Sequence, residues 1–349
     1  MPYTVSLHKE EREESMRRQK GKKELGFLYL VLCAVGVSTI FGFSFLFSKR
    51  GLETFSPFQL LAFRFSAAAI GLGILALFGW IKVSFKGKRV GLLLLLSLVQ
   101  PGLYFVFESY GLKYATSSEA GIMIALIPIV VTVFGALFLK EKPSLFQVLF
   151  ILLSTLGVSF IVVMGGIAAK NEGASLISGQ FLGYLLLLGA VFAAAFYNIL
   201  SRKSSLHFRP IEITFVMMWF GMISFNLLAI VEQAAAGKLS HYFAGLADPG
   251  ALFSILYLGI LSSIVAFFLV NFMLSRLEAS RSAIFGNLTT IISILAGVLF
   301  RNEKFLWFHL VGSIMILLGV WGTNRFSPSR VRRGKPSDKP AKVIFPEDF

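Results

Sequence analysis

Two ionisable side chains, Arg64 and Glu108, stand inside long apolar stretches of the sequence. A charged group inside a membrane-spanning segment is costly, so such residues are functional candidates by default. Measured by helical rise from the outer end of its own stretch, Glu108 lies roughly 6 Å deep and Arg64 roughly 9 Å deep. We therefore expect the two side chains at similar depth on neighbouring helices, facing the interior of a helix bundle.

Three roles for Arg64 and Glu108 stay open. The first is a structural ion pair that fixes helix packing, and the second is a pair that contacts or gates a substrate. The third is proton coupling by Glu108, because buried carboxylates serve as proton relays in membrane pumps and transporters. A nearby Arg64 would oppose this third role, since a cation favours the charged carboxylate.

Glu108 also ends a stripe of polar side chains. Gln100, Tyr104 and Glu108 follow one another at intervals of one helical turn, which predicts that they share one face of a helix. A polar stripe facing lipid would be expensive, so we expect it to face a cavity or another helix. Pro101 lies within the stripe and removes a backbone hydrogen bond near the middle of the helix. Broken helices near the membrane midplane are where secondary transporters build binding sites.

Four further side chains are weaker candidates for a binding cavity. Asn287 and Thr290 belong to a polar cluster in an otherwise apolar stretch. Trp219 lies in the middle of its stretch, where an interfacial role fits poorly, so it either lines an aromatic wall or packs in the core. Tyr197 is the fourth. The full set of candidate substrate-binding residues is Arg64, Gln100, Tyr104, Glu108, Tyr197, Trp219, Asn287 and Thr290.

The remaining inventory argues against an enzyme. The three aspartates, Asp248, Asp338 and Asp348, lie outside the apolar stretches, whereas metal-dependent membrane enzymes need clustered carboxylates. The four histidines are dispersed without zinc-binding spacing. The sequence also has no glycine-rich phosphate-binding motif that could support drive by ATP. We therefore expect no catalytic residues, no metal and no cofactor.

The composition indicates a membrane protein. The 349 residues are 56% hydrophobic and only 15% charged, against about 25% charged in soluble domains. A span needs roughly 20 apolar residues, and in lipid a continuous apolar stretch satisfies its backbone as a helix. The sequence therefore predicts an all-α integral membrane protein with ten transmembrane helices. The predicted spans are roughly 26–48, 58–81, 91–112, 118–139, 144–167, 180–200, 211–233, 250–273, 283–300 and 306–324.

Basic residues orient these spans. With the N-terminus inside, the inner segments hold 25 of the 33 Lys and Arg residues and the outer loops hold 7. Cytoplasmic segments of membrane proteins are enriched in Lys and Arg. The excess predicts a multi-pass protein of the plasma membrane, the inner membrane in a bacterium, with both termini cytoplasmic. It also accounts for the net charge of +15 without nucleic acid as a partner.

The two halves of the chain repeat each other. The motif GALFLKEK at 135–142 matches GVLFRNEK at 297–304, an offset of 162, and the same offset pairs LGV at 156–158 with LGV at 318–320. Each half holds five spans, an odd number, so the second half must cross the membrane in the opposite direction. This predicts two inverted five-helix repeats, 26–167 and 180–324. A charged cytoplasmic tail at 1–25 and a basic, disordered cytoplasmic tail at 325–349 flank them.

An ordered series of motifs resembles the EamA-type carriers of the drug/metabolite transporter superfamily. In the first half these are SP at 56–57, LAFR at 61–64, YGLKYATSS at 110–118 and KEK at 140–142; in the second they are YLGILSS at 257–263, EASRS at 278–282, GNLTT at 286–290 and NEK at 302–304. The sequence departs from the family at Phe41-Gly42, where a Trp-Gly pair is common, and at Thr290, where a proline is usual. The resemblance implies a central pocket lined by spans 1–4 and 6–9. It also implies that spans 5 and 10 are peripheral and in some members form a homodimer.

These observations lead us to expect a secondary transporter in contact with membrane lipid. It would move a small-molecule substrate by alternating access, with protons as one candidate for coupling. The resemblance implies that the substrate is an amino acid or related compound and that the direction is export. Two alternatives stay open: an exchanger of nucleotide sugars or sugar conjugates, and a non-transporting scaffold or sensor. A water-filled pocket near Tyr104 would favour the transporter, and a stripe packed against a helix would favour the scaffold.

Overall fold

The computed structural model describes residues 28–44, 46–48, 50–88, 90–114, 123, 126–170, 180–301 and 305–326, and within these ranges its regular elements are all helices. The predicted tails lie outside the described residues, apart from Arg325 and Phe326. In chain order the elements are the first helix (Leu28–Leu52), α2 (Pro57–Leu77), α3 (Gly91–Ser97), η1 (Leu98–Leu103), α4 (Tyr104–Tyr114), α6 (Ile127–Leu139), α7 (Leu145–Lys170), α8 (Gln180–Ser204), α9 (Pro210–Ala235), η2 (Leu239–His241), η3 (Ala244–Ala247), α10 (Pro249–Leu256), η4 (Tyr257–Ala266), α11 (Phe267–Arg276), α12 (Ala279–Ala283), η5 (Ile284–Asn287), α13 (Leu288–Arg301) and α14 (Trp307–Arg325).

Seven helical stretches within the described ranges are long and apolar enough to cross a membrane: Leu28–Leu52, Pro57–Leu77, Gly91–Gly111, Phe181–Ser204, Pro210–Ala235, Pro249–Arg276 and Trp307–Arg325. Two further apolar helices, Ile127–Leu139 and Leu145–Ile161, are shorter. Large apolar side chains such as Leu77, Leu137 and Leu299 are exposed, as a lipid-facing surface requires. The chain is thus a multi-pass helical membrane protein. The beginning of the predicted span 118–139 lies outside the described residues.

Proline marks the start of three of the long helices. Pro57, Pro210 and Pro249 each occupy a first-turn position, where a missing backbone N–H costs nothing. Ser56 closes a capping box with Gln59, and Asp248 accepts a hydrogen bond from the backbone of α10. These caps place the helix starts within one residue of the predicted spans 58–81, 211–233 and 250–273.

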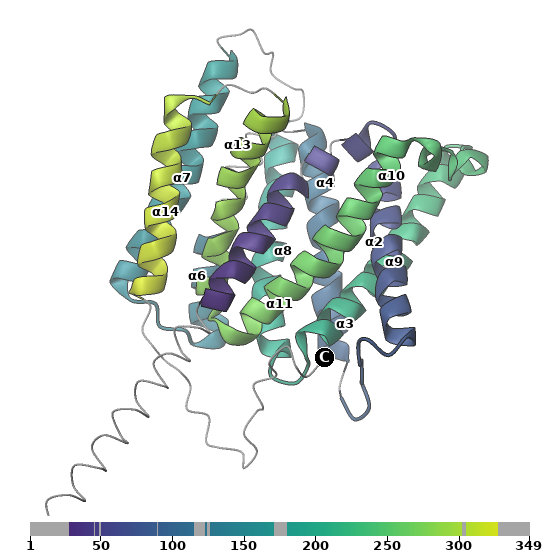
Figure 1. The fold of residues 1–349 in the computed structure, drawn as a ribbon, viewed down its shortest axis with the longest axis horizontal. Coiled ribbons are helices and arrows are strands. Elements are labelled where there is room, and N and C mark those ends of the chain that lie inside the picture. Colours follow the sequence, from purple (N-terminus) through teal and green to yellow (C-terminus); the bar gives the residue numbers. More distant parts are fainter. Residues whose placement is uncertain are drawn as a thin grey trace, which may run out of the picture.

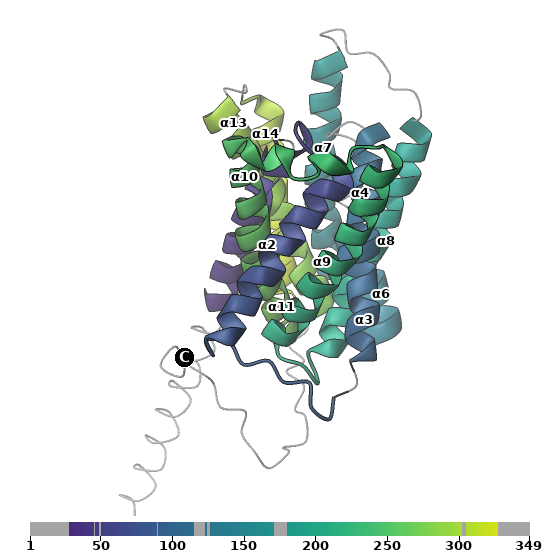
Figure 2. The same ribbon diagram turned by 90° about the vertical axis from the view of Figure 1, so that its right-hand side faces the viewer.

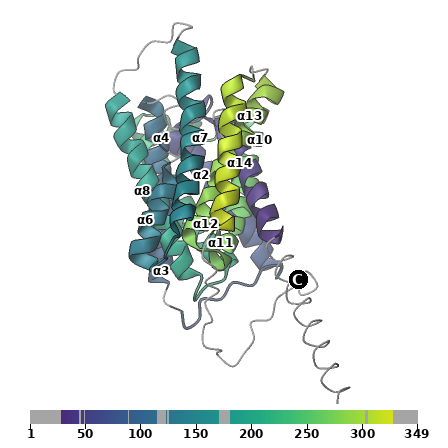
Figure 3. The same ribbon diagram turned by 90° about the vertical axis from the view of Figure 1, so that its left-hand side faces the viewer.

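The helices pack in pairs drawn from distant parts of the sequence. Figure 1 shows α7 and α14 side by side at one edge of the bundle, and the view from that edge in Figure 3 has both in front. At the opposite side α2 packs along α9, as Figure 2 shows, and α4 packs along α8. The wide-turn segment η4 crosses α2. The middle of α2 is therefore enclosed between α9 and η4.

Two apolar clusters fill the bundle. The larger one lies among α2, α9 and their neighbours, and its fully buried members include Phe65, Leu72, Met217, Phe225 and Leu258. The smaller one joins the first helix to α7, α14 and η5. The polar candidates described below are set into or beside these clusters.

Candidate functional site

Arg64 lies in the middle of α2 and its side chain crosses to the second half of the chain. Its Nε donates a hydrogen bond of 2.8 Å to Oγ of Ser263, and its Nη2 donates one of 2.9 Å to Oγ of Ser262. Only 5% of the residue is exposed. Within the described residues, the third nitrogen, Nη1, has no hydrogen-bond partner. The guanidinium is thus held in place with one side left unused.

Aromatic rings surround this guanidinium. Its central carbon lies 4.6 Å from the ring centroid of Phe105 and 5.5 Å from that of Phe65, distances at which a cation is attracted to a ring. Phe105 in turn contacts Phe65 and Tyr104 edge-on, with centroids 5.5 and 5.0 Å apart. Aromatic faces stabilise the charge without neutralising it.

Glu108 and Tyr104 lie one turn apart on α4 and touch each other. The Tyr104 hydroxyl donates a hydrogen bond of 2.9 Å to Oε1 of Glu108, so these two residues share the face that their spacing predicts. Both side chains are half-buried. Tyr104 contacts the ring of Phe105, which lies against the Arg64 guanidinium, yet the direct ion pair that the packing role requires is not formed between the described side chains of Glu108 and Arg64. The structure therefore keeps the two charges near each other but separate.

Gln100 lies at a break in its helix. Its backbone has φ −148° and ψ 115°, outside the helical region, and Pro101 follows within the wide-turn segment η1. The predicted interruption at Pro101 is thus confirmed. Because Gln100 is not helical, the polar stripe is interrupted between Gln100 and Tyr104. Gln100 is 7% exposed, and among the described residues its buried Oε1 has no hydrogen-bond partner.

Tyr197 belongs to a buried polar network that joins three helices. Its hydroxyl donates a hydrogen bond of 3.0 Å to Oδ1 of Asn271 on α11, and Ser201 donates a second one of 2.6 Å to the same oxygen. Nδ2 of Asn271 donates to Oγ1 of Thr214 on α9, at 3.0 Å. Asn271 has no exposed surface. The network ties α8, α9 and α11 together and occupies the Tyr197 hydroxyl.

The other three candidates lie among different neighbours. The ring of Trp219 on α9 is tilted against Phe215, with 5.9 Å between the ring centroids, and its buried Nε1 has no hydrogen-bond partner in the part of the chain that the structure describes. Asn287 in η5 donates a hydrogen bond of 3.0 Å to Ser154 of α7, which joins η5 to that helix. Thr290 is half-buried on α13. The structure thus groups Arg64, Tyr104 and Glu108, and sets Asn287 against α7.

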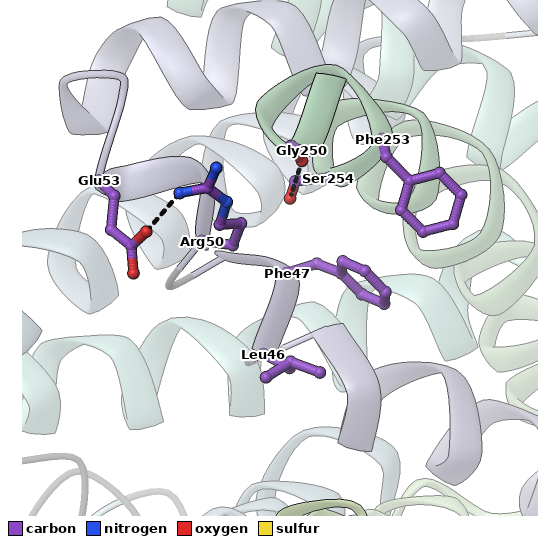
Figure 4. A pocket seen from close by; sticks show the side chains of 7 residues that line it. All are labelled: Leu46, Phe47, Arg50, Glu53, Gly250, Phe253 and Ser254. Atoms are coloured by element: carbon purple, nitrogen blue, oxygen red, sulfur yellow. Dashed lines mark hydrogen bonds and ion pairs between the residues drawn. The ribbon is translucent and has the colours of Figure 1, made fainter. Parts of the chain in front are cut away.

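A surface cavity of about 310 Å³ lies at the end of the first helix. Figure 4 shows the side chains that line it, with Phe47 and Phe253 on one side and Arg50 and Glu53 on the other. Arg50 forms two ion pairs, one with Glu53 at 2.6 Å and one with Asp248, at the start of α10, at 3.0 Å. The backbone N–H of Gly250, together with the charge of Arg50, holds the pKa of Asp248 below its usual range. We call Arg50, Glu53 and Asp248 the outer cluster.

Two contacts join the halves at the opposite end of the helices. Lys88, in the connection before α3, bonds Glu212 in the first turn of α9 at 2.7 Å. Glu141, just after α6, accepts hydrogen bonds from the backbone of Ala279 at 2.8 Å and from Oγ of Ser280 at 3.0 Å. Glu141 thereby caps the start of α12.

Sequence reasoning missed three residues that the structure gives a part in the centre. Ser262 and Ser263 hold Arg64, and Phe105 lies under its guanidinium. Two features of the sequence could have identified the serines. They are adjacent hydroxyl residues in the middle of an apolar stretch, and at the repeat offset of 162 they correspond to Gln100 and Pro101. Phe105 is one of 37 phenylalanines, so its residue type carries no such signal.

Comparison with known proteins places the whole helical region in one family. A model of the EamA-like transporter family matches residues 28–163 and 181–325. The uncharacterized transporter YcxC of Bacillus subtilis is 42% identical over 88% of this chain and 97% of its own length. A probable amino-acid metabolite efflux pump of Escherichia coli is 21% identical over 82% of this chain and 92% of its own length.

One solved crystal structure shares the fold. It superposes with a TM-score of 0.65 and 18% sequence identity, covering 86% of this chain and 97% of the other. The extent of the family match and the 42% identity to YcxC agree with the motifs of both halves and with the apolar helices. The chain belongs to the EamA-like transporter family, within the drug/metabolite transporter superfamily.

Proposed function

We propose that this protein is a secondary transporter of the plasma membrane that exports small metabolites, amino acids or related compounds, by alternating access. Its architecture in this proposal is ten transmembrane helices in two inverted repeats, 26–167 and 180–324. The observation that carries the proposal is the bond between Arg64 in the first half and Ser262 and Ser263 in the second. A buried charge is thus held where the two halves meet, which is where transporters of this architecture bind substrate.

The contact between α7 and α14 supports the inverted repeat. A Cβ added at Gly157 of α7 would lie 2.8 Å from the carbonyl oxygen of Gly312, and one added at Gly319 of α14 would lie 2.7 Å from that of Phe150. Adding the offset of 162 to 150 and 157 gives 312 and 319, so each half makes the same contact with the other. The contact order also makes the two helices antiparallel, as an inverted repeat requires.

Matching wide-turn segments give further support. The segment η1 lies between α3 and α4 and is broken at Gln100, whereas η4 continues as a helix from α10 to α11. Shifted by 162 residues, Leu98–Leu103 falls inside Tyr257–Ala266, so the two halves change helix type at corresponding positions.

Contacts between connections support the predicted order of the spans, because each contact joins two connections that the proposed topology places on the same side of the membrane. Arg50 follows the first predicted span, and Asp248 precedes the eighth. The proposed topology places both residues on the outer side, and their side chains form an ion pair. Lys88 and Glu212 both fall on the inner side, and they are also paired. A topology that put either pair on opposite sides of the membrane would be incompatible with these bonds.

Transport by purified protein in liposomes tests the proposed function. Vesicles are loaded with a pool of labelled amino acids, and efflux is followed with and without an imposed pH gradient. The Glu108→Gln variant and protein-free vesicles are run in parallel. We expect efflux that depends on the protein; if Glu108 couples protons, the variant keeps efflux and loses only its response to the gradient.

The alternatives give different results in the same assay. Efflux of sugar conjugates only in exchange for a second conjugate, with no amino-acid efflux, contradicts the proposal and favours the exchanger. A well-folded protein that moves neither class favours the scaffold or sensor. Amino-acid efflux that is equal with and without the gradient, in both wild type and variant, leaves the transporter intact and removes the coupling role of Glu108.

A further inference from the structure

The Nη1 side of the Arg64 guanidinium is suited to bind an anion. A guanidinium has five N–H donors and keeps its charge in proteins. Two of the Arg64 nitrogens are held by Ser263 and Ser262, and within the described residues Nη1 donates to nothing. The serine hydroxyls are neutral, and the rings of Phe105 and Phe65 attract the cation without neutralising it. An arginine used only for packing would be expected to pair directly with the carboxylate nearby.

Glu108 also has one charged atom without a hydrogen bond within the described residues. Its Oε1 accepts a hydrogen bond from Tyr104, and within the described part of the chain Oε2 accepts none. The ring of Phe105 contacts both the Arg64 guanidinium and Tyr104, the partner of Glu108, and the described side chains of Glu108 and Arg64 form no direct ion pair. Each charge therefore keeps one free atom, and the two charges have opposite signs.

The surroundings of the Arg64 guanidinium are aromatic. Phe105 contacts Phe65 and Tyr104, and it lies 6.4 Å from Phe267, whose ring contacts Tyr197. Aromatic walls exclude water and strengthen the field of each charge. They also provide apolar contact for whatever extends beyond the charged groups of a ligand. A ligand that suits this site carries a negative and a positive group a short distance apart, next to an apolar part.

We propose that Arg64 and Glu108 are the two poles of a binding site for α-amino acids with apolar side chains. In this site Nη1 of Arg64 binds the substrate carboxylate and Oε2 of Glu108 binds the substrate ammonium group. Ser262, Ser263 and Tyr104 are positioning residues that hold the two poles apart. This inference rests on the proposed function and specifies the substrate class of the same centre.

Ligands that lack one charge test the two poles separately. Labelled L-leucine is bound to the purified full-length protein in lipid nanodiscs. Leucine methyl ester, which has no carboxylate, and N-acetylleucine, which has no ammonium group, are then used as competitors. A hydrogen bond to a charged group is worth about 1.5–3 kcal/mol, so we expect each analogue to compete about tenfold to a hundredfold more weakly than leucine.

Two variants assign the poles. We call the weaker competition of an analogue relative to leucine its penalty. In Arg64→Gln the penalty of the methyl ester should disappear, while the penalty of N-acetylleucine stays. In Glu108→Gln the penalty of N-acetylleucine should disappear, while that of the methyl ester stays. Gln at 108 keeps an oxygen for Tyr104, which limits the disturbance to the charge. Arg64→Lys keeps the positive pole and should retain part of the penalty of the methyl ester. Arg50→Gln and Glu53→Gln are matched controls in the outer cluster and should change neither penalty.

Several outcomes overturn the inference. Equal competition by leucine and both analogues in the wild type contradicts it, as does loss of both penalties together in each variant while the protein stays monodisperse. Either result can coexist with leucine efflux from liposomes, in which case the proposed function stands and only the site assignment fails. If neither leucine nor the amino-acid pool binds or moves, the inference and the amino-acid part of the proposed function fail together.

Discussion

Replacing Asn271 separates the packing of the bundle from its binding site. The Asn271→Leu change removes three interhelical hydrogen bonds, to Tyr197, Ser201 and Thr214, from a fully buried position. Interhelical hydrogen bonds in membrane proteins average about 0.6 kcal/mol, so three of them are worth about 2 kcal/mol. Leucine has the same number of side-chain heavy atoms and the same branch point as asparagine, so the change leaves no cavity, although its methyl groups are bulkier than the amide. We expect the free energy of unfolding to fall by about 2 kcal/mol.

The Tyr197→Phe variant completes a double-mutant cycle. It loses a single hydrogen bond, so we expect a loss of about 0.6 kcal/mol and, because the hydroxyl is occupied by Asn271, an unchanged KM for transport. Combined with Asn271→Leu, it should cost almost nothing more, since the shared bond is already absent. Unfolding is followed by loss of helical circular dichroism as denaturing detergent is titrated in. The exposed Tyr29 supplies a matched control, Tyr29→Phe, with no expected change.

The opposite pattern would refute this reasoning. If Tyr197→Phe raises the KM for transport severalfold and leaves stability unchanged, then the Tyr197 hydroxyl binds substrate and is not committed to the hydrogen bond with Asn271. Additive losses in the double variant would show that Tyr197 and Asn271 act independently.

Three further changes test other contacts. The stabilising contribution of the Asp248 carboxylate is present above about pH 4 and is lost as pH falls through its lowered folded-state pKa. Asp248→Asn should abolish this acid-dependent loss in thermal unfolding measured from about pH 2 to 6. Gly319→Leu forces α14 away from α7 and should cost about 1–3 kcal/mol or more in detergent-induced unfolding. Lys88→Ala leaves the buried Glu212 without its cation and should cost about 1–3 kcal/mol, most of which Glu212→Gln should restore in the same unfolding assay.

The apolar pattern and the prolines predict much of the fold. Helix starts at Pro57, Pro210 and Pro249 follow from local chemistry alone, and so does the break at Pro101. Local spacing also places Tyr104 and Glu108 on one face. These features depend on residues within one or two turns of each other, which a single sequence contains in full.

Partners across the bundle could not be predicted in the same way. The depth of Arg64 predicts an interior position, but its actual partners, Ser262 and Ser263, lie about 200 residues away in the other half, and only the packing of α2 against η4 brings them together. Asn271 lies near the inner end of the predicted span 250–273, where a side chain would meet lipid headgroups. It is buried instead, because α11 continues to Arg276 and turns this side chain towards α8 and α9.

Alternating access requires one site between the two halves to open to each side of the membrane in turn. The sequence has a single cysteine, Cys33, so a Cys33→Ser protein carrying Tyr104→Cys has one reactive thiol next to Glu108. A membrane-impermeant thiol reagent is applied to right-side-out and to inside-out vesicles. We expect labelling of this cysteine from both sides, slowed by a transported amino acid. Labelling from one side only, whatever substrate or gradient is present, would contradict alternating access at this site.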